Sequence, residues 1–315
     1  MRVVIACLRF IIPAGSLLLL GILAAAGCGL GVGPAPSDVR LTITRDFGAR
    51  VLSHSDDPNV AGAETDMSLL LRNDAVTTRY GGGFVQSIDG LSGGQEGGQP
   101  VDWFYYVNGL EATKGAAATD VHPGDHVWWD HHDWSQTEDV PAVVGSFPEP
   151  FLNGIAGKRL PVRVECASAA GACETVLKRL RGVGVPAAVA ATGSGGAPQT
   201  LRVMVGTWSQ LEGDVAAQAL ERGPRASGVY ARFSRGGRTL TLLDQDGRET
   251  QTLNSDAGLV AATATGESAP VWLIGGTDAK GVDLAADAFD ESTLANHFAV
   301  ALTPNGPVAV PEVER

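Results

Sequence analysis

Residues 101–109 read VDWFYYVNG, and residues 126–134 read HVWWDHHDW. Both stretches are rich in the aromatic residues that favour strands, and the first ends in the Asn-Gly pair typical of a tight turn. They therefore predict two strands of a β-sheet. Because successive side chains of a strand point to opposite faces, the first stretch divides into two sets, Trp103, Tyr105 and Val107 on one face and Phe104 and Tyr106 on the other. One of these faces must be core.

The residues before these strands predict further strands and one helix. Alternating or short apolar stretches predict strands at residues 39–44, 49–53, 76–80 and 83–88. Residues 64–73 predict a helix that Thr65 or Asp66 can cap. Asp89-Gly90 predicts a turn, and the glycine-rich residues 91–99 predict a mobile loop.

Four motifs in this part of the chain carry a family resemblance. They are Gly83-Phe84-Val85, Ser87-Ile88-Asp89-Gly90, Trp103-Phe104-Tyr105-Tyr106-Val107-Asn108-Gly109, and Pro123-Gly124-Asp125 followed by Val127-Trp128-Trp129. Over about residues 38–135 they resemble the small β-rich domain at the C-terminus of transcobalamin and intrinsic factor. The same module occurs in bacterial surface proteins as a domain of unknown function, of the type numbered 4430.

The resemblance implies a ligand, because the domain forms one wall of a corrinoid-binding cleft in the animal proteins. Aromatic faces can pack on such a planar ligand. The candidate ligand-binding residues are Trp103, Tyr105, Tyr106, Asn108, Trp128 and Trp129. The alternative is that these aromatic side chains form the core of a small sheet. The matched motifs contain no residue that ligates cobalt.

Four of the six histidines lie within eleven residues, among several aspartates. Histidine and carboxylate side chains are ligands for zinc and similar cations. In an extended strand His126, Asp130 and His132 share one face, so they are candidate metal ligands. Alternate residues of a strand are about 7 Å apart, so only adjacent members could share an ion without a bend. The alternative is an exposed polar face with titrating histidines.

The N-terminus predicts export and lipid anchorage. Residues 1–27 have arginines, then a short apolar core, then small residues, which is typical of a secretory signal. Ala25-Ala26-Gly27-Cys28 resembles the bacterial lipobox, which implies lipidation of Cys28, although Leu is commoner than Ala at the first position. Residues 28–37 predict a flexible tether. The alternative is an ordinary cleaved signal with an incidental cysteine.

Composition excludes one class of partner and suggests a disulfide. The chain has a formal net charge of −12 and no basic run, which makes non-specific nucleic-acid binding improbable. Beyond the signal and Cys28, only Cys166 and Cys173 remain. In an oxidising compartment this pair predicts a disulfide, with two free buried thiols as the alternative.

The second half of the chain predicts alternating strands and helices. Residues 147–150, FPEP, indicate a linker into this half. We expect helices at residues 171–181, 208–220 and 279–289. Strands are expected at residues 160–165, 185–191, 200–206, 229–233, 239–244, 271–276 and 298–302, and residues 259–264 predict a strand or a helix. Thr277 and Asp278 follow a strand, where a ligand could bind, but capping of the next helix by Asp278 is the favoured interpretation.

Together these features predict a small β-rich domain at 38–150, in the α+β class, followed by an α/β domain with a mixed sheet at 151–315. We recognise no family in the second domain. The favoured function is a lipid-anchored protein on the extracytoplasmic face of the cell membrane. It would capture a small ligand, with cobalamin or another corrinoid implied by the resemblance, for uptake by a membrane transporter. We expect no enzyme activity and no required cofactor. The alternatives are a surface module that binds protein or polysaccharide with a flat face and, last, a hydrolase in the second domain.

Overall fold

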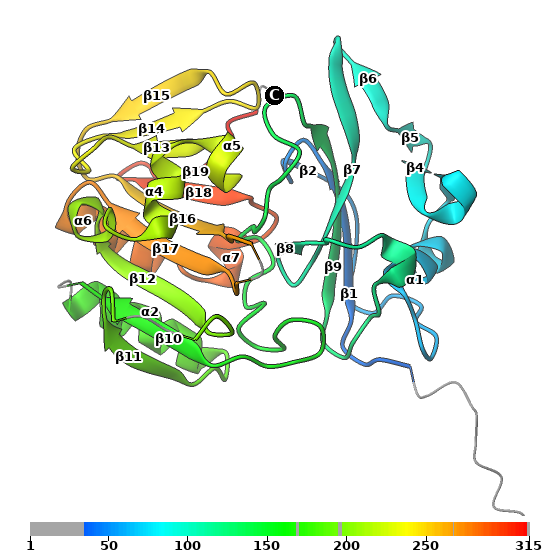
Figure 1. Ribbon diagram of the computed structural model, residues 1–315, viewed down its shortest axis with the longest axis horizontal. Helices are drawn as coiled ribbons and strands as arrows, with labels where there is room; N and C mark the ends of the chain where they lie inside the picture. Colours follow the sequence, from blue (N-terminus) through cyan, green and yellow to red (C-terminus); the bar gives the residue numbers. More distant parts are fainter. Residues whose placement is uncertain (1–34, 168–169, 195–196, 267, 314–315) are drawn as a thin grey trace, which may run out of the picture. The chain divides into compact units, whose positions relative to one another are not determined.

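A computed structural model describes residues 35–167, 170–194, 197–266 and 268–313. Its β-rich architecture has two larger sheets with helices and smaller sheets packed against them (Figure 1). This agrees with the predicted α+β and α/β class. Among the described residues, no helix has the length and apolar character needed to cross a membrane.

The first larger sheet is built around the two aromatic strands. Its strands run in the order β2-β1-β9-β7-β6, with β8 beside β7. β9 lies in the middle, parallel to β1 and antiparallel to β7. The bounds are β1 Arg40–Arg45, β2 Arg50–Ser55, β6 Gly94–Glu96, β7 Gln99–Val107, β8 Leu110–Glu111 and β9 His126–Asp133. The predicted aromatic strands are therefore neighbours.

One helix and a small sheet cover one face of this larger sheet. Helix α1, Asp66–Asn73, begins after Thr65, whose hydroxyl accepts a hydrogen bond from the Ser68 backbone N–H, so Thr65 is the cap. The small sheet consists of β3 Val76–Arg79, β4 Phe84–Ile88 and β5 Leu91–Ser92, and two 3-10 turns lie at Tyr80–Gly82 and Ala116–Ala118. The predicted loop at residues 91–99 is wrong in part, because it contains β5, β6 and the start of β7. β6 pairs with β7 across glycines 97 and 98, which turn the chain at positive φ.

The first larger sheet, which we call the aromatic sheet, is buried on both faces. Trp103, Tyr105 and Trp129 pack with residues of α1 and β4. Tyr106 and Trp128 face the other way and pack against residues from the second half of the chain. The alternation predicted from residues 101–109 is thus observed, and the second face is covered by distant sequence.

The second larger sheet has the order β11-β10-β12-β17-β16-β18-β19. The first four strands are parallel and the last three are antiparallel, which is a mixed sheet as predicted. The bounds are β10 Val162–Cys166, β11 Ala187–Ala191, β12 Leu201–Thr207, β16 Gly258–Thr263, β17 Val271–Gly276, β18 Ala299–Thr303 and β19 Gly306–Val310. The open alternative at residues 259–264 is a strand.

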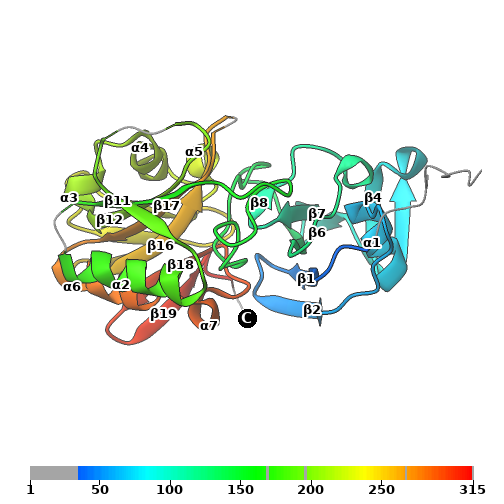
Figure 2. The same ribbon diagram turned by 90° about the horizontal axis from the view of Figure 1, so that it is seen from below.

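Two helices cover one face of this sheet, and smaller elements cover the other. Helices α2, Ala170–Gly182, and α6, Ala279–Asp287, lie side by side (Figure 2). The bounds of the remaining elements are α3 Trp208–Leu211, α4 Val215–Glu221, α5 Pro224–Ser227, α7 Glu291–Leu294, β13 Ala231–Phe233, β14 Leu240–Leu243 and β15 Glu249–Leu253. Asp278 caps α6 by accepting a hydrogen bond from Gly281 N, so its capping role is confirmed.

Two predictions for the second half are corrected. The helix expected at 208–220 is two helices, because Asp214 accepts a hydrogen bond from Ala216 N and starts a new helix after Gly213. The linker expected at 147–150 is buried, with both X-Pro bonds cis. Phe147 stacks edge-on against Phe289 at 4.7 Å between ring centroids, so these residues are core and not an exposed connection.

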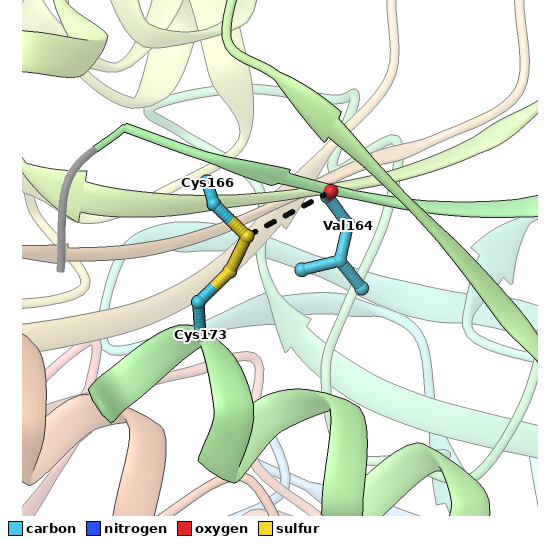
Figure 3. The surroundings of a disulfide bond; sticks show 3 residues. All are labelled: Val164, Cys166 and Cys173. Atoms are coloured by element: carbon cyan, nitrogen blue, oxygen red, sulfur yellow. Dashed lines mark hydrogen bonds between the residues drawn. A yellow bond between two sulfur atoms is a disulfide. The ribbon is translucent and has the colours of Figure 1, made fainter. Parts of the chain in front are cut away.

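A disulfide joins Cys166 at the end of β10 to Cys173 in the first turns of α2 (Figure 3). The two Cα atoms are 5.9 Å apart, and Cys173 is buried. The bond ties the helix to the strand that it covers. The predicted pairing is thus the one that the structure contains.

Candidate functional site

The described part of the chain contains a cleft of about 1120 Å³. Its walls come from residues 107–122, residues 139–160, Gln199, and two segments of the second half at 225–228 and 264–269, residue 267 excepted. Small-molecule sites usually have volumes of about 300–1,000 Å³, so this cleft suits a large ligand. It lies where the aromatic sheet meets the second half of the chain.

The interior of the cleft is mostly small or apolar. Leu110, Pro141, Ile155 and Leu160 line it together with several alanines. Leu110 begins β8, which follows the tight turn at the end of β7, and this turn sets the wall. Such a surface favours the apolar body of a ligand.

One carboxyl group, that of Glu111, lines this interior while only partly exposed. Its Oε2 accepts a hydrogen bond of 2.7 Å from the backbone N–H of Val140. Burial raises the pKa of Glu111 to about 7, and the charge of Asp139 adds to the rise while the Val140 hydrogen bond opposes it. A carboxyl group in a cleft with a pKa this far from its ordinary value is a candidate binding group.

The rim of the cleft carries both signs of charge. The exposed charged residues that line it are Lys114, Asp120, Asp139, Lys158 and Arg225. Since three are basic and two are acidic, the rim does not select strongly for an ion of one sign. It can donate and accept hydrogen bonds around a ligand with polar groups at its edge.

Five of the six predicted ligand-binding residues, the aromatic ones, lie in the two cores of the aromatic sheet, the sixth, Asn108, is also buried, and none of the six lines the cleft. Their exposed fractions are 6% for Trp103, 9% for Tyr105, 0% for Tyr106, 1% for Asn108, 0% for Trp128 and 2% for Trp129. The five aromatic rings therefore pack against other side chains. None of these rings is therefore positioned to stack on a ligand in the cleft.

Two of the six residues support the cleft wall from behind. The Tyr105 hydroxyl donates to the Lys114 carbonyl at 2.6 Å and lies 2.9 Å from Thr119 Oγ1. Asn108 donates to Asp125 Oδ1 and to the Gly154 carbonyl, which holds the Asn-Gly turn against the segment after residue 139. Their roles here are to position the wall.

The predicted metal site is not formed. The described residues contain no group of three or more histidine, cysteine or acidic side chains that could hold a metal ion. His126 Nε2 lies 2.8 Å from Thr42 Oγ1, and burial lowers the pKa of His126 to about 3. Asp130 instead accepts hydrogen bonds from backbone N–H groups and lies 2.7 Å from His132 Nδ1. All three side chains are buried, so the exposed-face alternative does not describe them either.

The residues that line the cleft were not among the sequence predictions. Glu111 follows the tight turn by two positions, but nothing in its sequence context distinguishes it from a surface glutamate. The other walls come from segments that are far apart in sequence and meet only in the folded chain. The predicted lipidation site, Cys28, lies outside the described residues.

Comparison with known proteins identifies the first part of the chain. The family model of DUF4430, a domain of unknown function, matches residues 63–133. The DUF4430 match runs from just before α1 to the end of β9 and includes residues 107–122 of the cleft wall. No curated protein matches the chain significantly.

Proposed function

We propose that this protein captures a small ligand in the cleft and presents it to a membrane transporter. The cleft carries the proposal, because a hollow of about 1120 Å³ with an apolar interior and a mixed polar rim is the form expected of a binding site. The alternative function, a surface module that binds protein or polysaccharide, predicts a flat face instead of a cleft. In this proposal the site binds its ligand and does not transform it.

A corrinoid is the proposed ligand. Its support is the resemblance of residues 38–135 to the transcobalamin C-terminal domain and the size of the cleft. A large ring with hydrogen-bonding groups at its edge would place its body on residues such as Leu110 and Ile155. Its edge would then meet the charged rim.

Filling the cleft should weaken this binding strongly. Ala226 is exposed, lies in α5 and lines the cleft, so Ala226→Trp places a large ring in the space for the ligand. Isothermal titration with cyanocobalamin and with dicyanocobinamide should show binding to the wild type and a loss of at least about tenfold in the variant. Ala49→Trp, at an exposed alanine outside the cleft wall, is the matched control and should bind as the wild type does.

Two outcomes would contradict this assignment. If the wild type binds neither corrinoid at tens of micromolar, a corrinoid is not the ligand. If Ala226→Trp binds as tightly as the wild type, the ligand does not occupy the cleft.

We also propose that the chain is anchored by lipid on Cys28 at the extracytoplasmic face. Several acyl chains give lasting membrane attachment, whereas a single chain gives only marginal attachment. Cys28→Ala should therefore release the protein into the soluble fraction, measured by cell fractionation and immunoblotting. Cys7→Ala, which changes a cysteine within the predicted signal, should leave it on membranes. Retention of the Cys28→Ala variant on membranes would refute the anchor.

A further inference from the structure

Strand β11, Ala187–Ala191, is an unprotected edge of the seven-stranded sheet. Among the strands that the structure describes it pairs with β10 alone, so its outer backbone groups have no partner in these strands. Its sequence, AAVAA, has no charged residue and no proline, and Val189 is 62% exposed. A row of free N–H and C=O groups with small side chains is a template for pairing with another strand.

The other outer strands of the described sheets are protected. Some are only two or three residues long, as β5, β6, β8 and β13 are. The longer ones carry a charge or a proline, namely Arg50 in β2, Arg79 in β3, Glu249 in β15 and Pro307 in β19. Short edges, charges and prolines are the usual means of preventing edge-to-edge pairing. β11 has none of them.

The sequence of β11 also matches itself. Ala187-Ala188-Val189-Ala190-Ala191 reads the same in both directions. In an antiparallel pair of two β11 strands centred on Val189, alanine would therefore face alanine and valine would face valine. A two-fold interface needs such self-complementarity.

The helix above this edge carries complementary charges. Arg179 of α2 contacts Asp290 and the Asp287 carbonyl, on the side where α6 lies. Because helical residues advance by about 100° each, Glu174 and Arg181 share the opposite flank, above the β11 edge. Both side chains are exposed.

The positions of Glu174 and Arg181 along the direction of β11 fit a two-fold axis that passes through Val189. The disulfide places Cys173 beside Cys166, which is in register with Ala191, and α2 runs back toward the level of Ala187. The midpoint between Glu174 and Arg181 thus falls near the level of Val189. A two-fold axis at Val189 would bring Glu174 of each copy toward Arg181 of the other.

We propose that two copies of this chain associate by antiparallel pairing of their β11 strands about a two-fold axis at Val189. The pairing joins the two seven-stranded sheets into one continuous sheet, and the α2 helices of the two copies lie side by side. The interface leaves the cleft free, because no residue of β11 or α2 lines it. It does not depend on the proposed ligand.

Sedimentation velocity over a range of concentrations tests the proposal, with the Cys28→Ala variant used as the parent to exclude lipid effects. The parent should form a concentration-dependent dimer. Val189→Lys should remain monomeric because the two lysines would face each other. Val215→Lys, at a valine in α4 that is 65% exposed, is the matched control and should dimerise as the parent does. A parent that stays monomeric at its highest soluble concentration, or a Val189→Lys variant that still dimerises, would overturn the proposal.

Charge exchange and crosslinking test the geometry. Glu174→Arg and Arg181→Glu should each weaken the dimer, since like charges would meet, and the double variant should restore it. Val189→Cys should form a crosslinked dimer under mild oxidation, because directly opposed residues of antiparallel strands have Cα atoms about 4.5–5.5 Å apart. Val215→Cys should not. Absence of rescue in the double variant, or equal crosslinking at both positions, would refute the two-fold pairing.

Discussion

Asp130→Ala should lower the free energy of unfolding by about 3–5 kcal/mol, which is a large share of the stability of an ordinary domain. Asp130 lies in the middle of β9 and is 0% exposed. Its Oδ1 accepts a hydrogen bond of 3.1 Å from Phe47 N, and its Oδ2 accepts one of 2.9 Å from Gly48 N. The Thr44 hydroxyl donates to Oδ2 at 2.5 Å, and His132 Nδ1 lies 2.7 Å from Oδ1.

The reason for the large effect is that alanine leaves the Phe47 and Gly48 backbone N–H groups and His132 Nδ1 buried without the partner that Asp130 provides. An unpaired buried donor costs about 1–3 kcal/mol, and the Asp130 carboxylate satisfies several at once. The turn it holds also packs tightly against the second half of the chain. Gly48 is at φ +80°, and a Cβ there would lie 1.8 Å from the Asn296 carbonyl oxygen. Loss of Asp130 therefore loosens a contact between the two halves.

Urea unfolding followed by tryptophan fluorescence measures this effect. Asp56→Ala is the matched control, because the Asp56 side chain is 76% exposed and its contact is an exposed pair with His54 at 3.2 Å. Surface changes of this kind usually alter stability by no more than about 0.5 kcal/mol. Equal unfolding midpoints for the two variants would show that the Asp130 contacts are not important to the fold.

Asp130 also shows what the sequence could and could not predict. Its place on a strand followed from the pattern of residues 126–134, and that prediction is confirmed. The pattern also placed His126 and His132 on the same face. It could not show what covers that face, because the covering residues, such as Phe298, lie far along the chain. The local pattern of histidines and aspartates is the same for a buried hydrogen-bonded network as for an exposed metal site, so it does not distinguish the two.

The aromatic residues show the same limit. Period-two alternation predicted that Tyr105 and Tyr106 point to opposite faces, and each ring lies in a different core. One face has to be buried in any sheet, but the second could have been a binding wall. Tyr106 instead contacts Phe298 with ring centroids 5.5 Å apart. Only long-range packing decides between the two, and local pattern carries no information on it.

Strands at the sheet margins were missed for a different reason. β15, with sequence ETQTL, lacks apolar alternation because its side chains are mostly exposed. β19 contains Pro307, which usually interrupts a strand, but β19 is an edge strand, where proline is tolerated. The cleft was missed because its walls come from five separate parts of the sequence.

Asp66→Asn should stabilise the protein at pH 8, in contrast to most changes of buried polar groups. Asp66 begins α1, is 0% exposed, and neither carboxyl oxygen has a hydrogen-bond partner among the residues that the structure describes. Burial raises the pKa of Asp66 from 3.8 to about 8, and the charges of Asp125 and Asp120 add to the rise. The side chain is therefore a neutral acid in the folded chain at neutral pH.

The sign of the pH effect follows from proton binding. Between pH 3.8 and about 8 the folded state keeps a proton on Asp66 that the unfolded state has released. Stability must fall as pH rises through this window, by at most about 1.4 kcal/mol per pH unit, and then level off above the folded pKa. Asparagine has the same shape and no proton to lose, so this contribution disappears in the variant.

The difference in unfolding free energy between Asp66→Asn and the wild type should therefore grow with pH. We expect it to be small near pH 4 and to reach on the order of a few kcal/mol in favour of the variant at pH 8. Urea unfolding at several pH values measures it, and taking the difference cancels the titration of the other carboxyl groups. Asp57→Asn, at an exposed aspartate, should show a difference that does not change with pH. A pH-independent difference for Asp66→Asn would mean that the pKa of Asp66 is the same in the folded and the unfolded chain, which contradicts this prediction.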